Sequence, residues 1–260
     1  MSASVASSSA PRAGLADLLA AETLKLRRSL TWVFVLLLPL LAVITGTVNY
    51  VGNQGVLSAG WQSLTTQVTI FYALFFFSVG VALVVSAAWR PEHRGTSWNA
   101  MVTMPVSPAK VVAAKTLVVM LPVAVMQVVL VVLTWLSGVL VLRLPDSVPL
   151  GLLLASAVTV VAALPLVALQ SLLAMRLRSF GGPVALDLAG TIVGLGVVRE
   201  SEALAQVWPY SLVTSAQVLG SDAMANAQAL DWGGITPVLT GVLVSGTVCW
   251  GLLLLSARRR

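Results

Sequence analysis

Six apolar runs dominate the sequence, and most of them are long enough to cross a membrane as a helix. The runs span residues 32–51, 68–89, 111–142, 150–175, 183–198 and 235–256. A helix needs about 20 apolar residues to cross roughly 30 Å of hydrocarbon. Only 9% of the 260 residues are charged, whereas a soluble domain carries about 25%. The runs lack the alternation of barrel strands, so they predict an all-α membrane protein with six transmembrane helices.

Basic residues at the ends of these runs predict the orientation of the chain. Cytoplasmic loops are enriched in lysine and arginine, so both termini and the connection 90–110 are predicted to lie in the cytoplasm, in a multi-pass protein of the cell membrane. This topology accounts for the net charge of +6 without a nucleic-acid partner. Thirteen of the fifteen basic residues fall on the predicted cytoplasmic side, namely Arg12, Lys25, Arg27, Arg28, Arg90, Arg94, Lys110, Lys115, Arg176, Arg178, Arg258, Arg259 and Arg260, against Arg143 and Arg199 on the other.

The remaining segments complete the predicted organisation. Residues 1–13 are small and polar and predict a disordered tail, and residues 14–260 form one transmembrane domain. Leucines near helical spacing in 14–30 predict a helix lying along the inner membrane face, the alternative being an extension of the first span. The first apolar run is interpreted as a retained helix. Residues 199–234 form the long outer segment, in which short helices can dip back into the outer leaflet.

The connection between the second and third spans, residues 90–110, holds an unusual set of side chains for so apolar a chain. Gly95 and Pro105 delimit a short predicted helix, and Ser107 with Pro108 predict the capped start of the next span. At helical spacing its apolar face fits a groove on a partner protein, although an ordinary amphipathic loop is the simpler interpretation. The candidate docking residues are Glu92, His93, Arg94, Trp98, Met101 and Pro105.

The stretch "EHRGTSWNAMVTMPVSPAKVVAAK", residues 92–115, resembles the loop of ABC-2-type transporter permeases, in particular those of the lantibiotic-immunity and bacitracin-resistance-like groups. The similarity extends to an interfacial first helix, six spans and a large outer segment. The resemblance implies that the short helix is a cytoplasmic coupling helix, which docks into a separate nucleotide-binding subunit. It further implies that ATP and Mg are bound by that partner, with no cofactor in this chain. A second permease subunit, identical or different, would complete the transporter.

The sequence contains no recognisable nucleotide-binding or catalytic motif. The nearest approach to a phosphate-binding loop, "AKVVAAKT" at 109–116, has alanines where glycines are needed. Asp187 is the one clear ionisable residue inside a span, which makes it a functional candidate. A structural role, paired with Arg176, Arg178 or helix-start amides, and a substrate or proton role both remain open. An intramembrane protease would need a second acidic group within reach.

Small residues in the last two runs predict close helix contacts. Gly190 and Gly194 form a GxxxG pattern, and Gly241 with Ser245 forms a similar pair. Such surfaces pack helices within one chain or between two subunits.

These features favour the membrane subunit of an ATP-driven ABC exporter of an amphipathic substrate, such as an antimicrobial peptide or drug. The alternatives are a non-transporting membrane scaffold and an ABC-2 exporter of a lipid or polysaccharide.

Overall fold

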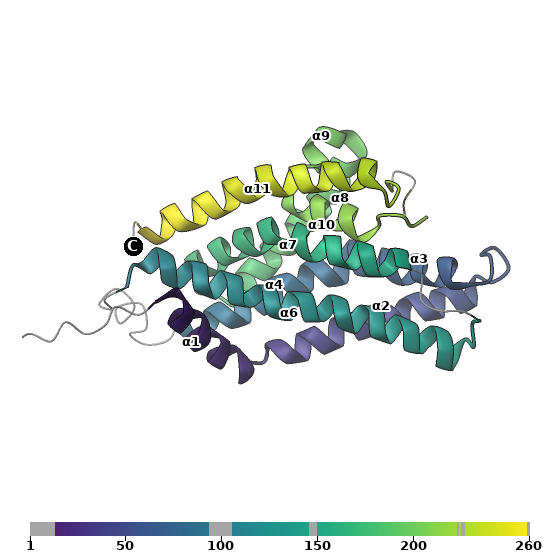
Figure 1. The fold of residues 1–260 in the computed structure, drawn as a ribbon, viewed down its shortest axis with the longest axis horizontal. Helices are drawn as coiled ribbons and strands as arrows, with labels where there is room; N and C mark the ends of the chain where they lie inside the picture. Colours follow the sequence, from purple (N-terminus) through teal and green to yellow (C-terminus); the bar gives the residue numbers. More distant parts are fainter. Residues whose placement is uncertain (1–13, 94–105, 146–149, 223, 225–226, 259–260) are drawn as a thin grey trace, which may run out of the picture.

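The computed structural model describes residues 14–93, 106–145, 150–222, 224 and 227–258, and every regular element within these ranges is a helix. The long helices lie side by side along one elongated bundle (Figure 1). This confirms the predicted all-α class. The elements are α1 (Leu15–Arg27), α2 (Thr31–Gly52), α3 (Trp61–Phe71), η1 (Tyr72–Phe76), α4 (Phe77–Trp89), η2 (Arg90–His93), α6 (Pro108–Leu136), η3 (Ser137–Val141), α7 (Leu150–Arg176), α8 (Gly181–Glu200), α9 (Glu202–Ala205), α10 (Pro209–Gln217) and α11 (Trp232–Arg258).

Among the described residues, five helical segments are long and apolar enough to cross a membrane. They are Thr31–Gly52, Trp61–His93, Pro108–Val141, Leu150–Arg176 and Trp232–Arg258. Each coincides with one of the predicted spans, apart from differences at the ends. The remaining predicted span, 183–198, lies in α8, whose apolar part Gly181–Val197 is shorter. That α8 forms a sixth transmembrane helix stays a prediction.

The second of these segments starts earlier than the sequence predicts, at Trp61 instead of Val68. Its first turns contain polar residues, two of which form hydrogen bonds within the chain: Thr65 Oγ1 donates to the carbonyl oxygen of Trp61, and Gln67 accepts from Asn49 on α2. The helix also contains a wider π-helical turn, in which the amide of Phe77 donates to the carbonyl oxygen of Tyr72. Internal hydrogen bonding therefore extends the helix beyond its apolar run.

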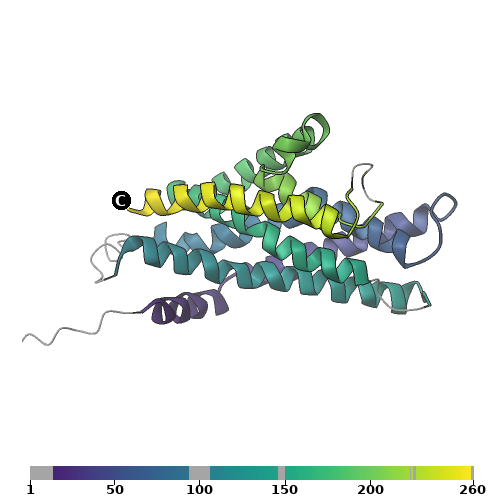
Figure 2. The ribbon, with the colours of Figure 1, turned by 45° about the horizontal axis from the view of Figure 1, so that its top comes forward.

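The structure confirms one local prediction at a helix end and decides between two alternatives at another. The side chain of Ser107 accepts a hydrogen bond from the amide of Lys110 at 3.3 Å, and Pro108 occupies the first turn of α6. Residues 28–30 separate α1 from α2, so α1 is a helix of its own and not an extension of the first span. It lies beside the bundle and packs against α6 (Figure 2).

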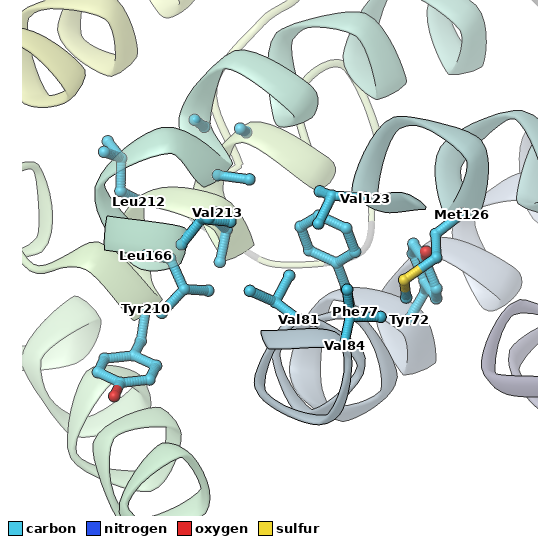
Figure 3. Close-up of a cluster of buried hydrophobic side chains, with 14 of the residues drawn as sticks. Tyr72, Phe77, Val81, Val84, Val123, Met126, Leu166, Tyr210, Leu212 and Val213 are labelled. Atoms are coloured by element: carbon cyan, nitrogen blue, oxygen red, sulfur yellow. The ribbon is translucent and has the colours of Figure 1, made fainter. Parts of the chain in front are cut away.

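The segment containing α4 is the centre of the bundle. In its most apolar stretch 67% of the residues are buried, against 39% for the corresponding stretches of α2 and α11. Figure 3 shows the core: Phe77 of α4 faces Val123 of α6, and Leu166 of α7 lies near Val213 of α10. Burial of such side chains gives a close-packed interior even in a protein with an apolar exterior.

Part of the predicted outer segment folds back into the bundle as α10, whose residues are almost all buried. Its anchor is the GxxxG surface of α8. Trp208 Nε1 donates to the carbonyl oxygen of Gly190 at 3.1 Å, and Ser211 Oγ donates to that of Gly194 at 3.0 Å. A Cβ on Gly190 would lie 2.4 Å from the Tyr210 ring. These glycines therefore serve packing within the chain.

Gly241 plays the same part on α11. A Cβ there would lie 1.9 Å from the backbone oxygen of Gln206, in the segment that leads into α10. Ser245, one turn further along α11, is also buried. The glycines of both predicted small-residue surfaces thus pack closely against the segment 206–212.

Candidate functional site

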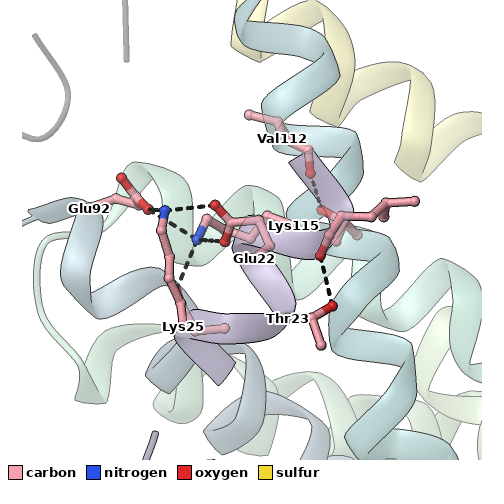
Figure 4. A network of polar contacts seen from close by, with 9 residues as sticks. Glu22, Thr23, Lys25, Glu92, Val112 and Lys115 are labelled. Atoms are coloured by element: carbon pink, nitrogen blue, oxygen red, sulfur yellow. Dashed lines mark hydrogen bonds and ion pairs between the residues drawn. The ribbon is translucent and has the colours of Figure 1, made fainter. Parts of the chain in front are cut away.

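Four charged side chains meet at the end of the bundle that holds α1 and the start of α6 (Figure 4). Glu22 and Lys25 come from α1, Glu92 from η2 and Lys115 from the second turn of α6. Positions 22 and 25 lie one turn apart on α1, so their side chains reach the same neighbours. These four residues are called the root network below. Glu92 lies just before residues 94–105 in the sequence, and Lys115 lies after them.

Positive and negative groups alternate around the root network. Lys115 Nζ forms ion pairs with Glu22 Oε2 and, at 3.0 Å, with Glu92 Oε1. Lys25 Nζ lies 2.7 Å from Glu22 Oε1 and 3.2 Å from Glu92 Oε1. Each acid therefore contacts both bases, and the four formal charges cancel.

Burial makes this pairing necessary. Lys115 is only 2% exposed, and Glu22 and Glu92 are buried as well. A buried charge without a partner is very costly, because it loses hydration and gains nothing in return. Lys115 is further held by the carbonyl oxygen of Ala88 at 3.4 Å and by the ring of Trp89, whose centroid lies 5.7 Å away. The network therefore fixes α1, η2 and α6 relative to one another.

Lys25 is the accessible member of the network, with half of its side chain exposed. Partial burial alone would lower the pKa of Lys25, but the hydrogen bonds and charges of Glu22 and Glu92 outweigh it and raise the pKa above its ordinary value. The stability that Lys25 contributes is therefore present at neutral pH and is lost as the pH rises through that raised pKa.

The short helix η2 has further anchors besides Glu92. His93 Nε2 lies 2.6 Å from the carbonyl oxygen of Ala174, near the end of α7. The guanidinium of Arg90 lies 5.7 Å from the centre of the Phe180 ring, just before α8. The root network, the end of α7 and the start of α8 therefore all hold η2, the segment that directly precedes residues 94–105.

Of the predicted docking residues, the structure describes Glu92 and His93 and places both against the bundle. Glu92 is 7% exposed, so its carboxylate holds the root network together. Arg94, Trp98, Met101 and Pro105, with the predicted short helix, lie outside the described residues.

Sequence reasoning missed the other three members of the root network. It treated Lys25 and Lys115 only as charges that set the orientation, and it gave Glu22 no role. One signal was present: Lys115 falls inside the predicted span 111–142, and a charge within a span needs a specific partner. Which acids would supply it depends on tertiary contacts between residues far apart in sequence.

Asp187 forms a second polar cluster, deep in the bundle and separate from the root network. Its carboxylate is fully buried. Ser78 Oγ of α4 donates to Asp187 Oδ2 at 2.8 Å, and Gln170 Nε2 of α7 donates to Oδ1 at 2.9 Å. Ser78 Oγ also lies 2.8 Å from Thr191 Oγ1, and Gln170 Nε2 lies 3.0 Å from the hydroxyl of Tyr210.

The expected arginine partner of Asp187 was wrong. Arg176 Nε instead donates to Ser256 Oγ on α11 at 2.8 Å, and Arg178 is exposed in the turn that follows α7. Asp187 lies more than one turn inside α8, where the neutral side chains of α4 and α7 reach it first. Neutral donors from neighbouring helices therefore take the place of the predicted ion pair.

The fold and these sites define a multi-pass helical membrane protein. A family model described as "ABC-2 family transporter protein" matches residues 18–194, well over half of the sequence. The chain therefore belongs to the ABC-2 transporter family and is a permease, the membrane transport subunit of an ABC transporter, which is not itself catalytic. The matched range includes the whole root network and Asp187. No curated protein matches the sequence.

Proposed function

We propose that this permease couples ATP hydrolysis by a separate nucleotide-binding subunit to the export of an amphipathic substrate, and that residues 94–105 receive the movement of that subunit. Permeases of this family normally work with an ABC ATPase subunit. ATP and Mg would be bound there, and both termini and the 90–110 connection would face it in the cytoplasm. The observation that carries the proposal is the root network at the base of this connection.

The network supports the proposal because it joins both ends of the connection to three helices. Glu92 precedes residues 94–105 and Lys115 follows them, and the two side chains pair with each other and with Glu22 of α1. A force applied to the connection would reach α1, α4 and α6 together, since separating them would leave buried charges unpaired. His93 and Arg90 would pass the same displacement to α7 and α8.

In this scheme Glu92 and His93 are positioning residues, and Trp98 and Met101 make the docking contact. A tryptophan at helical spacing with a methionine is typical of an interface anchor. Arg94 and Pro105 would flank this contact on either side. A second permease subunit, the same chain or a related one, would supply the other half of the transport path.

The substrate class follows from the resemblance of residues 92–115 to the loop of permeases that remove antimicrobial peptides from the membrane. Growth of cells with and without this chain, in a series of amphipathic peptides and drugs, tests that class directly. Unchanged sensitivity to these compounds, together with altered surface lipid or polysaccharide, would instead favour export of those molecules. If neither sensitivity nor surface composition changes and no ATPase subunit co-purifies with the chain, a scaffold is favoured.

Replacing Trp98 by alanine is expected to weaken association with the ATPase subunit by roughly 30-fold, the effect of losing an interface anchor worth about 2 kcal/mol. The measurement is co-purification of the full-length tagged permease with its ATPase subunit, followed by a binding titration. Glu92→Gln should bind nearly normally, because Glu92 is buried beneath α1, but should weaken the dependence of ATPase activity on the permease.

The matched control is Trp232→Ala. Trp232 is 80% exposed at the start of α11, at the opposite end of the bundle. It should leave association unchanged. Wild-type association of a folded Trp98→Ala permease would refute the docking assignment, and thermal unfolding of each variant shows whether it is folded.

A further inference from the structure

The Asp187 cluster is unusual because, among the residues that the structure describes, no cationic side chain pairs with its carboxylate. Asp187 receives hydrogen bonds from Ser78 and Gln170, which are both neutral. The segments that supply its neighbours contain few other ionisable residues. Helix α4 contains no charged residue, Arg176 of α7 hydrogen-bonds to Ser256, and α10 contributes Tyr210. Helix α8 itself carries Arg199 and Glu200 only at its far end. Cys249 of α11 is also buried.

An ionised carboxylate at this position would be expensive. Two neutral donors replace only part of the hydration that the group loses, and moving an unpaired charge into a membrane interior costs several kcal/mol. The neutral acid avoids that cost and keeps both contacts. The root network shows the contrast within the same molecule, since there each buried acid contacts two lysines.

The two hydroxyl groups beside Asp187 allow the proton to bind without movement of heavy atoms. Ser78 Oγ lies 2.8 Å from both Asp187 Oδ2 and Thr191 Oγ1. A hydroxyl group both donates and accepts. With the acid ionised, Thr191 donates to Ser78 and Ser78 to Asp187; with the acid protonated, Asp187 donates to Ser78 and Ser78 to Thr191. The same three oxygen atoms satisfy both states.

We propose that Asp187, Ser78 and Thr191 form a proton-binding site inside the bundle, which holds a proton while α4, α7, α8 and α10 are packed together. Ionisation would require water at the carboxylate, so the proton leaves when α8 separates from α4 and returns when they close. A proton fits the site better than a metal cation, because the Gln170 nitrogen faces the carboxylate as a donor and cannot serve as a cation ligand.

Infrared spectroscopy of the full-length protein in lipid nanodiscs tests the proposal, because a protonated carboxyl group absorbs apart from a carboxylate. At neutral pH we expect a protonated-carboxyl band that shifts when aspartate is labelled with ¹³C. The band should vanish in Asp187→Asn and remain in Asp222→Asn, which alters an exposed residue.

Two further measurements keep the result decisive if Asp187→Asn does not fold. Ser78→Ala removes one hydrogen-bond partner and should shift the frequency of the labelled band without abolishing it. Thermal unfolding in sodium, potassium and choline buffers should be the same. A neutral-pH spectrum with no labelled protonated-carboxyl band would overturn the proposal, and so would stability that depends on sodium, which would assign the site to a metal cation.

Discussion

Replacing Lys115 by alanine is expected to lower the free energy of unfolding by about 3–5 kcal/mol, the typical effect of removing one partner from a buried ion pair. The change leaves Glu22 and Glu92 buried near each other, with only the half-exposed Lys25 between them. We therefore expect α1 to detach from α6. Chemical denaturation in detergent micelles measures the stability, and protease sensitivity after Lys25 or Arg27 measures the release of α1.

Lys110→Ala is the matched control, because Lys110 lies on the same helix one turn earlier and is exposed. Its effect should stay within about 0.5 kcal/mol. Adding Glu22→Gln to Lys115→Ala removes one of the two unpaired acids and should recover part of the lost stability. Equal stability of Lys110→Ala and Lys115→Ala would show that the root network does not hold α1 in place.

Gly241→Ala is expected to cost about 1–3 kcal/mol or more, because the new methyl group has no room. Its carbon would lie 1.9 Å from the Gln206 backbone oxygen and 2.8 Å from Leu212 Cδ1. The backbone cannot rotate away as a side chain can, so the segment 206–217 must shift. Denaturation of the purified protein gives the stability.

Gly251→Ala on the same helix provides the comparison. A Cβ there meets nothing within 4 Å, and alanine favours a helix over glycine by up to about 1 kcal/mol in water. Gly241→Ala should therefore lower the free energy of unfolding, whereas Gly251→Ala should leave it unchanged or raise it slightly. Similar values would mean that α11 does not approach residues 206–212 as closely as the structure places it.

Helix positions were predictable because apolar runs report burial in lipid directly. The sequence located α2, α6, α7 and α11 to within a few residues, and the Ser107–Pro108 cap confirms that local signals mark a helix start. The early start at Trp61 was not predictable from hydropathy. Its polar residues are tolerated only because Asn49 and other partners of the same chain accept or donate their hydrogen bonds.

The candidate sites were predictable only in part. Asp187 stood out because a lone acid in an apolar run is rare. Its partners Ser78 and Gln170 come from other helices and carry no signal of their own. Glu92 was singled out for its position in the loop, yet its contacts are with Glu22's neighbours Lys25 and Lys115 inside the bundle. Residue types indicate the chemistry, whereas long-range contacts decide which residues meet.

The π-helical turn at Tyr72–Phe76 has a consequence for how the central helix meets its neighbours. Gly46 of α2 packs against the backbone of Val68 before this turn, and Ser78 reaches Asp187 of α8 after it. One residue of an α-helix corresponds to a rotation of about 100°, and a π turn inserts one such residue. Without the inserted residue, Ser78 would point in a different direction around the helix axis and would not face Asp187. The insertion therefore allows the same helix to contact α2 before the π turn and α8 after it.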